Sequence, residues 1–296
     1  MAAVTRRFTI APPVPFRLEQ VVRTHGWVEL APWRWEAGVL ARRERLGAAT
    51  GELAIRQSAP TRVVVTWRGD ADTPAPARRA VLGAVGRALS WDWDHAAFCT
   101  LADALDPAAA ALVLAGGGRL LRGTSFYEDF VKTVCTINTS WAGTIAMTTR
   151  LVERVGRGTF PTPRQVLRAG EARLRERCRL GFRAPFVIAA TRRLLADRAI
   201  DEAGHGVADA LGYDYLLSLK GIGPYAAAHC RVLLHDFSRL PVDTVLMAHG
   251  RERLGLADLP AIEAFFERWG DYRFLGFRLP RILARDAARE GTQFSP

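Results

Sequence analysis

The chain is poor in groups that hold metal ions or iron–sulfur clusters. It has only four cysteines in 296 residues, and no two of them have the Cys-x-x-Cys spacing of zinc ribbons and cysteine-ligated clusters. The six histidines are scattered, and no His-Glu-x-x-His motif occurs. We therefore expect no metal, no iron–sulfur cluster and no other cofactor. The thiols are expected to be reduced and to lie in the core at Cys99, Cys135, Cys178 and Cys230.

Long apolar runs are also missing. No run approaches the roughly 18 apolar residues of a transmembrane helix. Pro12, Pro13 and Pro15 interrupt the stretch after Arg6 and Arg7 that would otherwise form the core of a signal peptide. The composition, 49% apolar and 24% charged, is that of a globular protein. We expect a cytoplasmic monomer with no membrane partner.

Lysine is nearly absent, although the chain is strongly basic. Lys132 and Lys220 are the only lysines, and arginine supplies the rest of the positive charge behind a formal net charge of +11. A basic surface attracts polyanions, and each DNA phosphate that a protein neutralises steepens the salt dependence of binding by roughly 0.9 log units. The charge favours a nucleic-acid partner, with an arginine-rich composition that serves no special partner as the alternative.

The first hundred residues favour β-strands, which we expect to form an antiparallel sheet. Four short segments are rich in β-branched and aromatic residues and are separated by glycine and proline: Trp27–Trp35, Val39–Glu44, Glu52–Gln57 and Arg62–Trp67. A helical pattern begins after Pro76 and runs through Leu89. The triplet Gly116-Gly117-Gly118 lacks the Gly-Lys-Ser/Thr ending of a phosphate loop, so it predicts a turn or linker.

The rest of the chain has a helical pattern. Ser125 with Glu128 predicts a capping box at one helix start, and Thr162-Pro163 with Gln165 predicts another. Later helices are expected at Phe186–Leu195, Tyr213–Ser218, Pro224–Leu234, Thr244–Leu254, Pro260–Trp269 and Leu279–Arg289. The predicted fold class is α+β, with an N-terminal antiparallel β-sheet domain and its trailing helices over 1–115 and a mainly α-helical core over 116–296.

The most informative segment is a helix, a tight turn and a second helix between Leu216 and Ala228. The turn is Gly221-Ile222-Gly223, and Pro224 opens the second helix. Glycine lets a backbone approach a ligand closely, and the isoleucine between the glycines can return to the core. The free N–H groups and positive dipole end of the second helix suit a phosphate. By itself this pattern is also that of an ordinary helix–helix turn.

Twenty residues after Gly223, Pro241-Val242-Asp243 directly precedes another helical pattern. A carboxylate there can cap the helix, which would keep it ionised. It would also face the same groove as the helix–turn–helix segment. Removal of a base from DNA passes through an oxocarbenium-like sugar, which a fixed negative charge and an activated water assist. Capping and catalysis are therefore compatible roles for Asp243.

The stretch from Lys220 to Asp243 resembles the helix-hairpin-helix and Gly/Pro-Asp (HhH-GPD) signature of the DNA glycosylase superfamily. The resemblance is closest to the 3-methyladenine and 8-oxoguanine glycosylase branch. It implies a base-excision repair enzyme, located in the cytoplasm with the nucleoid, that binds double-stranded DNA containing a damaged base. It also implies that Asp243 is the catalytic residue and that the target base is flipped out of the stack.

The resemblance extends upstream and implies further site residues. Leu180-Gly181-Phe182-Arg183-Ala184 is similar to a turn of the family. Phe126 to Val155 is similar to the helix pair that supplies the residue filling the hole left by a flipped base, here Asn138, for which a helix-end hydrogen bond is the alternative. The implied DNA-binding residues are Asn138, Lys220, Gly221, Ile222, Gly223, Tyr225 and Ala226. The implied base-pocket residues are Phe126, Tyr127 and Trp141, for whose rings core packing is the alternative, and Lys132, for which projection to solvent is the alternative.

A run of arginines lies next to this turn. Its members are candidates for contacts with the DNA backbone, and a solvated face is the alternative reading of such a run. The run comprises Arg173, Arg175, Arg177, Arg179 and Arg183.

Two departures from the family narrow the prediction. Members that also nick the backbone carry a lysine four residues beyond the first hairpin glycine, as a Schiff-base nucleophile, whereas this chain has Tyr225 there. The cluster-bearing branch is disfavoured because no cysteine follows Cys230. We expect a monofunctional hydrolase acting on an alkylated or oxidised purine. The alternatives are a non-catalytic binder of damaged or branched DNA and a bifunctional glycosylase/lyase that uses Lys132 or Lys220.

Overall fold

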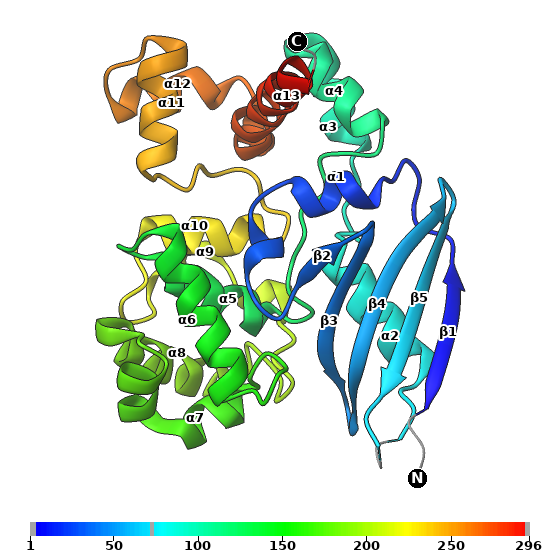
Figure 1. The fold of residues 1–296 in the computed structure, drawn as a ribbon. Helices are drawn as coiled ribbons and strands as arrows, with labels where there is room; N and C mark the ends of the chain where they lie inside the picture. The colour runs from blue at the N-terminus through cyan, green and yellow to red at the C-terminus, as the bar shows by residue number, and fades with distance from the viewer. Residues whose placement is uncertain (1–3, 72–73, 294–296) are drawn as a thin grey trace.

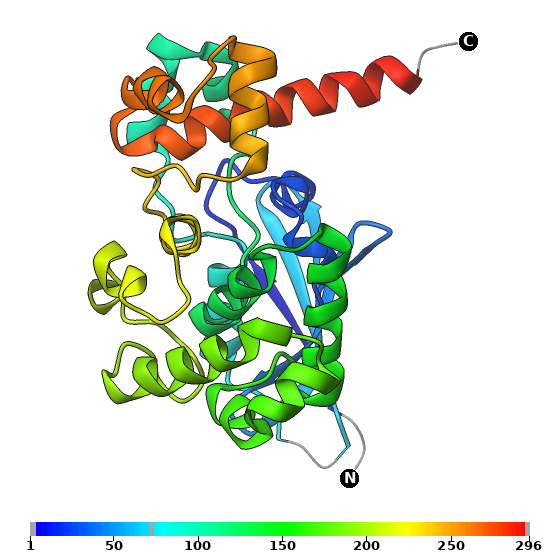
Figure 2. The same ribbon diagram turned by 90° about the vertical axis from the view of Figure 1, so that its left-hand side faces the viewer.

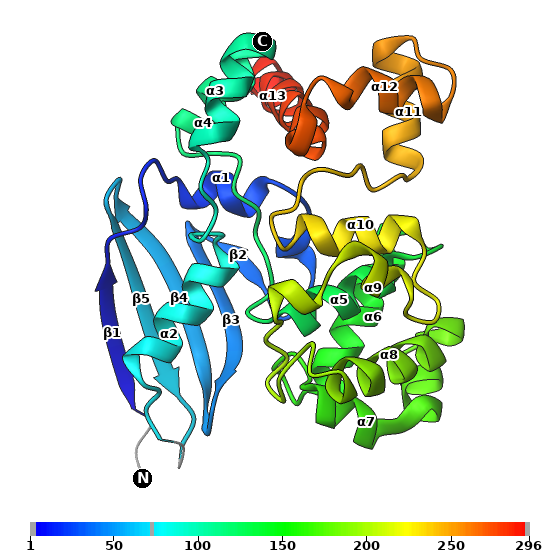
Figure 3. The ribbon, with the colours of Figure 1, turned by 180° about the vertical axis from the view of Figure 1, so that it is seen from behind.

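The N-terminal part is a five-stranded antiparallel sheet. In the computed structural model, which describes residues 4–71 and 74–293, the strand order is β1-β5-β4-β3-β2 (Figure 1). Alternate residues of β5, among them Val63, Val65 and Trp67, are buried on one face. Helix α2 (Arg78–Ala88) covers a face of this sheet (Figure 3). The strands are β1 (Thr5–Ile10), β2 (Arg34–Glu36), β3 (Val39–Leu46), β4 (Ala49–Ala59) and β5 (Arg62–Gly69).

The strand predicted at Trp27–Trp35 is wrong. Residues Trp27–Glu29 form a 3₁₀ turn, η1, and only Arg34–Glu36 pair as a strand. Trp27, Leu30 and Trp33 are all buried, and a spacing of three residues brings side chains to one side of a turn, whereas a strand needs a spacing of two. The first strand, β1, was not predicted.

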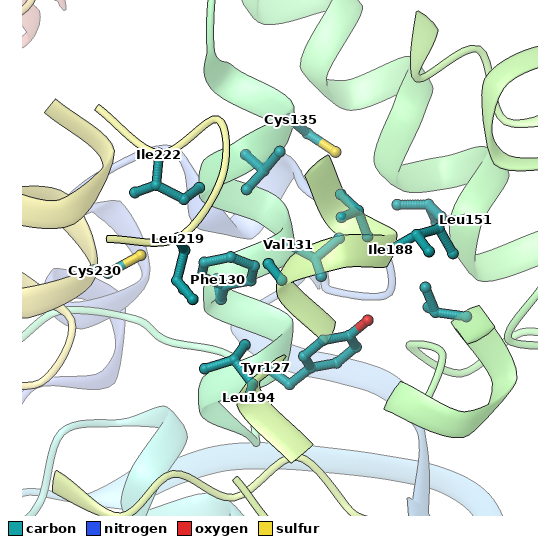
Figure 4. Packing of buried hydrophobic residues seen from close by; sticks show 14 of the residues in the cluster. Tyr127, Phe130, Val131, Cys135, Leu151, Ile188, Leu194, Leu219, Ile222 and Cys230 are labelled. Atoms are coloured by element: carbon teal, nitrogen blue, oxygen red, sulfur yellow. The ribbon is translucent and has the colours of Figure 1, made fainter. Parts of the chain in front are cut away.

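The middle of the chain forms a helical bundle around α5. Its apolar cluster, shown in Figure 4, joins residues from 126 to 230. The capping box at Thr162 and Gln165 is confirmed, whereas Ser125 caps its helix and Glu128 does not return the bond. The elements are α5 (Phe126–Thr136), α6 (Trp141–Arg154), α7 (Pro163–Ala172), η2 (Arg173–Arg177), η3 (Gly181–Arg183), α8 (Ala184–Ala196), η4 (Ala208–Ala210), α9 (Tyr213–Leu217) and α10 (Pro224–Val232).

A third group of helices combines distant parts of the sequence. The helices that follow the sheet share an apolar cluster with the C-terminal helices, where Phe98 stacks on Trp269 at 6.0 Å between ring centroids. Figure 2 shows this group gathered at one end of the molecule. The helix expected from Leu279 begins six residues earlier and continues through Pro280. The group comprises α3 (Ala96–Leu105), α4 (Pro107–Leu114), α11 (Thr244–Leu254), α12 (Leu259–Glu267), η5 (Gly270–Tyr272) and α13 (Arg273–Gln293).

Short segments join these parts. Helix α1 (Leu18–Arg23) and η1 lie between β1 and β2 along the chain and lead to the place where the three parts meet (Figure 1). Gly116 and Gly118 have φ values of 95° and 81°, so the glycine triplet is a turn as predicted. None of the described helices has both the length and the apolar character of a membrane-spanning segment.

Candidate active site

A pocket of about 630 Å³ opens where the sheet domain and the two helical groups meet. This volume lies within the usual range of ligand sites. Its walls come from the segment that ends in η1, the end of α5, the loop between α5 and α6, the start of α6, helix α10, the start of α11 with the residues before it, and α13. The lining residues are His25, Gly26, Trp27, Thr136, Ile137, Asn138, Thr139, Trp141, Thr144, Tyr225, His229, Val242, Asp243, Thr244, Val245 and Arg278.

Asp243 is the only carboxylate in the lining of this pocket. It is the N-cap of α11, and its Oδ1 accepts a hydrogen bond from the N–H of Leu246 at 2.8 Å. No hydrogen bond joins Oδ2 to another of the described residues. Burial lowers the pKa of Arg278 to about 10, and the charge of Asp243 opposes that shift. One oxygen of the carboxylate is thus fixed by the helix, and the other is available to a ligand.

A row of four aromatic rings in contact forms part of the pocket wall. His25 stacks on Trp27 at 4.9 Å between centroids, Trp27 contacts His229 at 5.2 Å, and His229 stacks on Tyr225 at 5.8 Å. The indole N–H of Trp27 donates to Asp129 Oδ1 at 3.0 Å, which fixes the orientation of the ring. The row therefore offers a rigid aromatic surface.

The two histidines of this row are neutral. Burial lowers the pKa of His25 well below its usual value, and burial lowers the pKa of His229 to about 4, with Arg278 adding to both shifts. Both ring nitrogens of His25 and Nε2 of His229 have no hydrogen-bond partner among the described residues. Buried polar atoms without partners are uncommon in proteins and call for an explanation.

The loop before α6 and the first residue of that helix each present a predicted residue to the pocket. Asn138 has a φ of 47°, in the left-handed region. Arg183 holds this conformation, because its guanidinium donates to the carbonyls of Ile137 at 2.9 Å and Asn138 at 3.0 Å. Arg183 is therefore a buried support for the loop and not part of a solvated face, and its candidate contact with the DNA backbone stays a prediction. Trp141 lies on the rim, with its Nε1 donating to Glu29 at 2.9 Å.

The predicted hairpin is present between α9 and α10. Gly221 has a φ of 81°, and its Cα lies so close to the Phe186 ring that a Cβ would be 2.2 Å from it. Ile222 is buried in the bundle core, as expected (Figure 4). Gly223 is the N-cap of α10 and supplies no side chain to its free N–H groups. Lys220 and Gly223 are exposed, and Tyr225 connects the hairpin to the pocket.

Three residues predicted for the base pocket lie elsewhere. Phe126 is in the bundle core, and so is Tyr127 (Figure 4). The Tyr127 hydroxyl is 2.6 Å from that of Thr191. Lys132 is fully buried, and its Nζ donates to Glu128 at 2.7 Å. The physical reason is the position of α5: every residue from Phe126 to Cys135 is buried, and Thr136, at the end of the helix, is its only residue in the pocket lining. Ala226 is also buried, so only its backbone N–H can serve the predicted contact.

Several pocket residues were not predicted from the sequence. His229 follows Tyr225 by four residues on α10, and this spacing puts both rings on one helix face. The spacing could therefore have predicted that His229 accompanies Tyr225 in the pocket. No sequence spacing predicts the other three pocket residues, because they come from opposite ends of the chain. They are His25, Trp27 and Arg278. The expected core thiols are found at Cys135, Cys178 and Cys230, whereas Cys99 is partly exposed.

Solved structures share this architecture. The 3-methyladenine DNA glycosylase from Archaeoglobus fulgidus superposes with a TM-score of 0.70, covering 92% of this chain and 96% of that chain at 20% identity. The chain has a DNA glycosylase fold. MBOgg1 in complex with a low-affinity DNA ligand matches with a TM-score of 0.64, covering 95% of this chain and 99% of that chain at 15% identity.

A third match is a glycosylase with a second activity. The Clostridium acetobutylicum 8-oxoguanine glycosylase/lyase bound to DNA with cytosine opposite 8-oxoguanine has a TM-score of 0.58, with 88% of this chain and 99% of that chain covered at 15% identity. No protein-family model matches the sequence, and no curated protein does. The predicted α+β class of a glycosylase fold, with its N-terminal antiparallel sheet and mainly helical remainder, is confirmed.

Proposed function

We propose that the protein is a monofunctional DNA glycosylase that hydrolyses the N-glycosidic bond of a flipped-out alkylated or oxidised purine. The observation that carries this proposal is the position of Asp243. Its carboxylate lies in the wall of a pocket large enough for a base, beside a row of aromatic rings and within a glycosylase fold. A duplex base reaches such a pocket only after it leaves the stack.

Asp243 stabilises charge and activates water in this proposal. The Leu246 N–H holds Oδ1, so Oδ2 faces the sugar of the flipped nucleotide. As the bond to the base lengthens, the sugar gains positive charge, and the carboxylate stabilises that charge. The same oxygen then accepts a proton from the water that attacks the anomeric carbon. The products are the free base and an abasic site.

The hairpin and the Asn138 loop hold the DNA. The free N–H groups at the start of α10 bind a backbone phosphate, because Gly223 leaves that helix end open. Exposed Lys220 adds a positive charge beside it. The left-handed Asn138 fills the space from which the base has moved. Phosphate contacts position the duplex without reading its sequence.

The aromatic row and its histidines bind the flipped base. The two end rings of the row, His25 and Tyr225, have outer faces on which the base can stack, and stacking contributes about 1–3 kcal/mol per base. The unpartnered nitrogens of His25 and His229 are placed to become hydrogen-bond partners of the base edge. Since both imidazoles are neutral, each presents one donor and one acceptor.

The lysines argue against the lyase alternative. No lysine lines the pocket. Lys132 is sealed in an ion pair with Glu128, and Lys220 is outside the pocket on the exposed side of the hairpin. A Schiff base requires a free amine next to the sugar, so borohydride should trap no covalent DNA adduct.

The test is base release from duplexes that contain alkylated purines, 8-oxoguanine, uracil or hypoxanthine, with Asp243→Asn as the matched control. We expect the wild type to release one purine lesion. The variant should keep its DNA affinity and lose activity by on the order of 10²–10⁴-fold or more. Normal turnover by Asp243→Asn would refute the role of this residue. Tight binding to abasic DNA without any base release would support the non-catalytic binder instead.

A further inference from the structure

A second cavity lies at the C-terminal end of α6, whereas the candidate active site lies at the N-terminal end of this helix. Its volume is about 550 Å³, and it shares no residue with the candidate active site. Five arginines from the sheet, the end of α6 and the segments that follow line it, together with Val155, Gln165 and Ala169. They are Arg45, Arg154, Arg157, Arg168 and Arg173.

These five arginines have no acidic partners. Among residues 4–71 and 74–293, none of them forms an ion pair with a carboxylate. The lining itself contains no aspartate or glutamate. An adjoining hollow shares three of the arginines and adds Glu153 and Glu176, but neither glutamate pairs with them. Five like charges around one hollow repel each other, and a bound anion would remove that repulsion.

Two of the guanidinium groups are held in place. Arg173 Nη2 donates to the carbonyl of Arg154 at 2.7 Å, and Arg154 Nη1 donates to the carbonyl of Arg177 at 2.9 Å. Each such bond uses one N–H of a group that has five. Arg157, in the loop after α6, has a left-handed φ of 57°. The charges are thus partly preorganised, and most of their N–H donors have no partner in the part of the chain that the structure describes.

Phosphate is the ligand that this arrangement fits. Planar guanidinium groups bind phosphate oxygens in pairs, and clustered arginines are a usual means of phosphate recognition. The five arginines carry five positive charges, whereas a single phosphate group carries only about 1.5 to 2 negative charges, so a run of phosphates fits better. We propose that this cavity is a second anion site that binds consecutive phosphates.

The position of the cavity indicates where such phosphates come from. Helix α6 runs from Trp141 in the candidate active site to Arg154 in this cavity (Figure 1). Its thirteen steps of about 1.5 Å separate the two by about 20 Å. On a duplex whose axis runs along α6, the backbone phosphates of one strand are about 3.4 Å apart, so this distance would correspond to about six nucleotides. The backbone of a DNA duplex held at the hairpin is one source, and a free oligophosphate is the other.

The experiment compares duplex length. Undamaged duplexes of about 11 and about 31 base pairs differ in whether they extend more than about six nucleotides from the centre. Binding is measured by anisotropy across a salt series for the wild type and for Arg45→Glu/Arg168→Glu. The matched control is Arg79→Glu/Arg192→Glu, which changes the net charge equally at exposed arginines of α2 and α8. Thermal unfolding checks that all the proteins are folded, and calorimetry with inorganic tripolyphosphate provides a second probe.

We expect the long duplex to bind the wild type more tightly than the short one. The cavity variant should lose this gain, and its salt slope on the long duplex should fall by about one to two, while the control keeps both. Saturable tripolyphosphate binding without a length effect, lost only in the cavity variant, would support the site and identify a free oligophosphate as its ligand. Equal behaviour of the cavity and control variants with both probes would overturn the proposal. Since the duplexes are undamaged, the outcome does not depend on base release.

Discussion

At the residue scale, His229 connects the packing of α10 with the proposed binding of the base. Its ring lies between Trp27 and Tyr225, and its Nε2 has no partner among the described residues. The ring therefore has two separable properties, an apolar face and a polar edge.

The variant His229→Phe separates these two properties. Phenylalanine keeps the stacked ring and removes the nitrogens, so the fold should be retained. We expect KM for the damaged duplex to rise by about tenfold, which corresponds to the net contribution of one hydrogen bond, while binding of undamaged DNA is unchanged. Steady-state kinetics of base release give the answer. An unchanged KM would show that His229 only packs.

At the scale of elements, the two hairpin glycines have different physical roles. Gly221 needs its left-handed φ of 81° and the close approach of Phe186. Gly223 has an ordinary backbone, and a Cβ there would meet nothing within 4 Å. The first glycine therefore serves the fold, and the second keeps the N-terminus of α10 accessible.

This difference predicts opposite outcomes for the two alanine variants. Gly221→Ala should lose about 1–3 kcal/mol of unfolding free energy through strain and overpacking. Gly223→Ala should keep its stability but bind DNA more weakly, with a salt slope smaller by about 0.9, because one phosphate contact is lost. Urea unfolding and salt-dependent anisotropy measure the two effects. Destabilisation by Gly223→Ala without a change in slope would contradict the assignment.

Structural features that depend on residues close together in the sequence could be predicted. The hairpin turn, the caps at Thr162 and Asp243 and most helices depend on residues within a few positions of each other, and the structure shows them as expected. The turn at Trp27 could not be predicted from its aromatic content, because strand and turn use the same residues at different spacings. The pocket was predicted only in part. Its partners His25 and Arg278 come together solely through tertiary packing.

At the scale of the whole molecule, a buried charge network joins the sheet to the helical bundle. Arg42 of β3 forms two hydrogen bonds with Glu128 of α5, at 3.1 and 2.8 Å, and Lys132 adds a third at 2.7 Å. All three side chains are fully buried. Burial alone would raise the pKa of Glu128, but the two cations outweigh it and lower the pKa to about 2.

The network should make stability depend on acid pH. Because the folded pKa of Glu128 is below its ordinary value of 4.5, its contribution is complete above pH 4.5 and is lost as the pH falls towards 2. The variant Glu128→Gln should lose about 3–5 kcal/mol at pH 7, since it leaves the buried Lys132 without a counter-ion and Arg42 with Glu44 alone. Urea unfolding from pH 7 to pH 2 should show the two proteins converging in acid. A constant difference across this range would contradict the role of the network.

The burial of Lys132 has a practical consequence for the chemistry of the intact protein. Of the two lysines in the chain, Lys132 is sealed within its ion pair, and Lys220 is exposed at the hairpin. An amine-directed reagent such as an acylating dye therefore meets a single reactive lysine side chain, and that side chain lies on the surface proposed to bind DNA. The rate of acylation at Lys220, with and without DNA, would report directly on occupancy of the hairpin. The scarcity of lysine thus gives this protein a built-in labelling site.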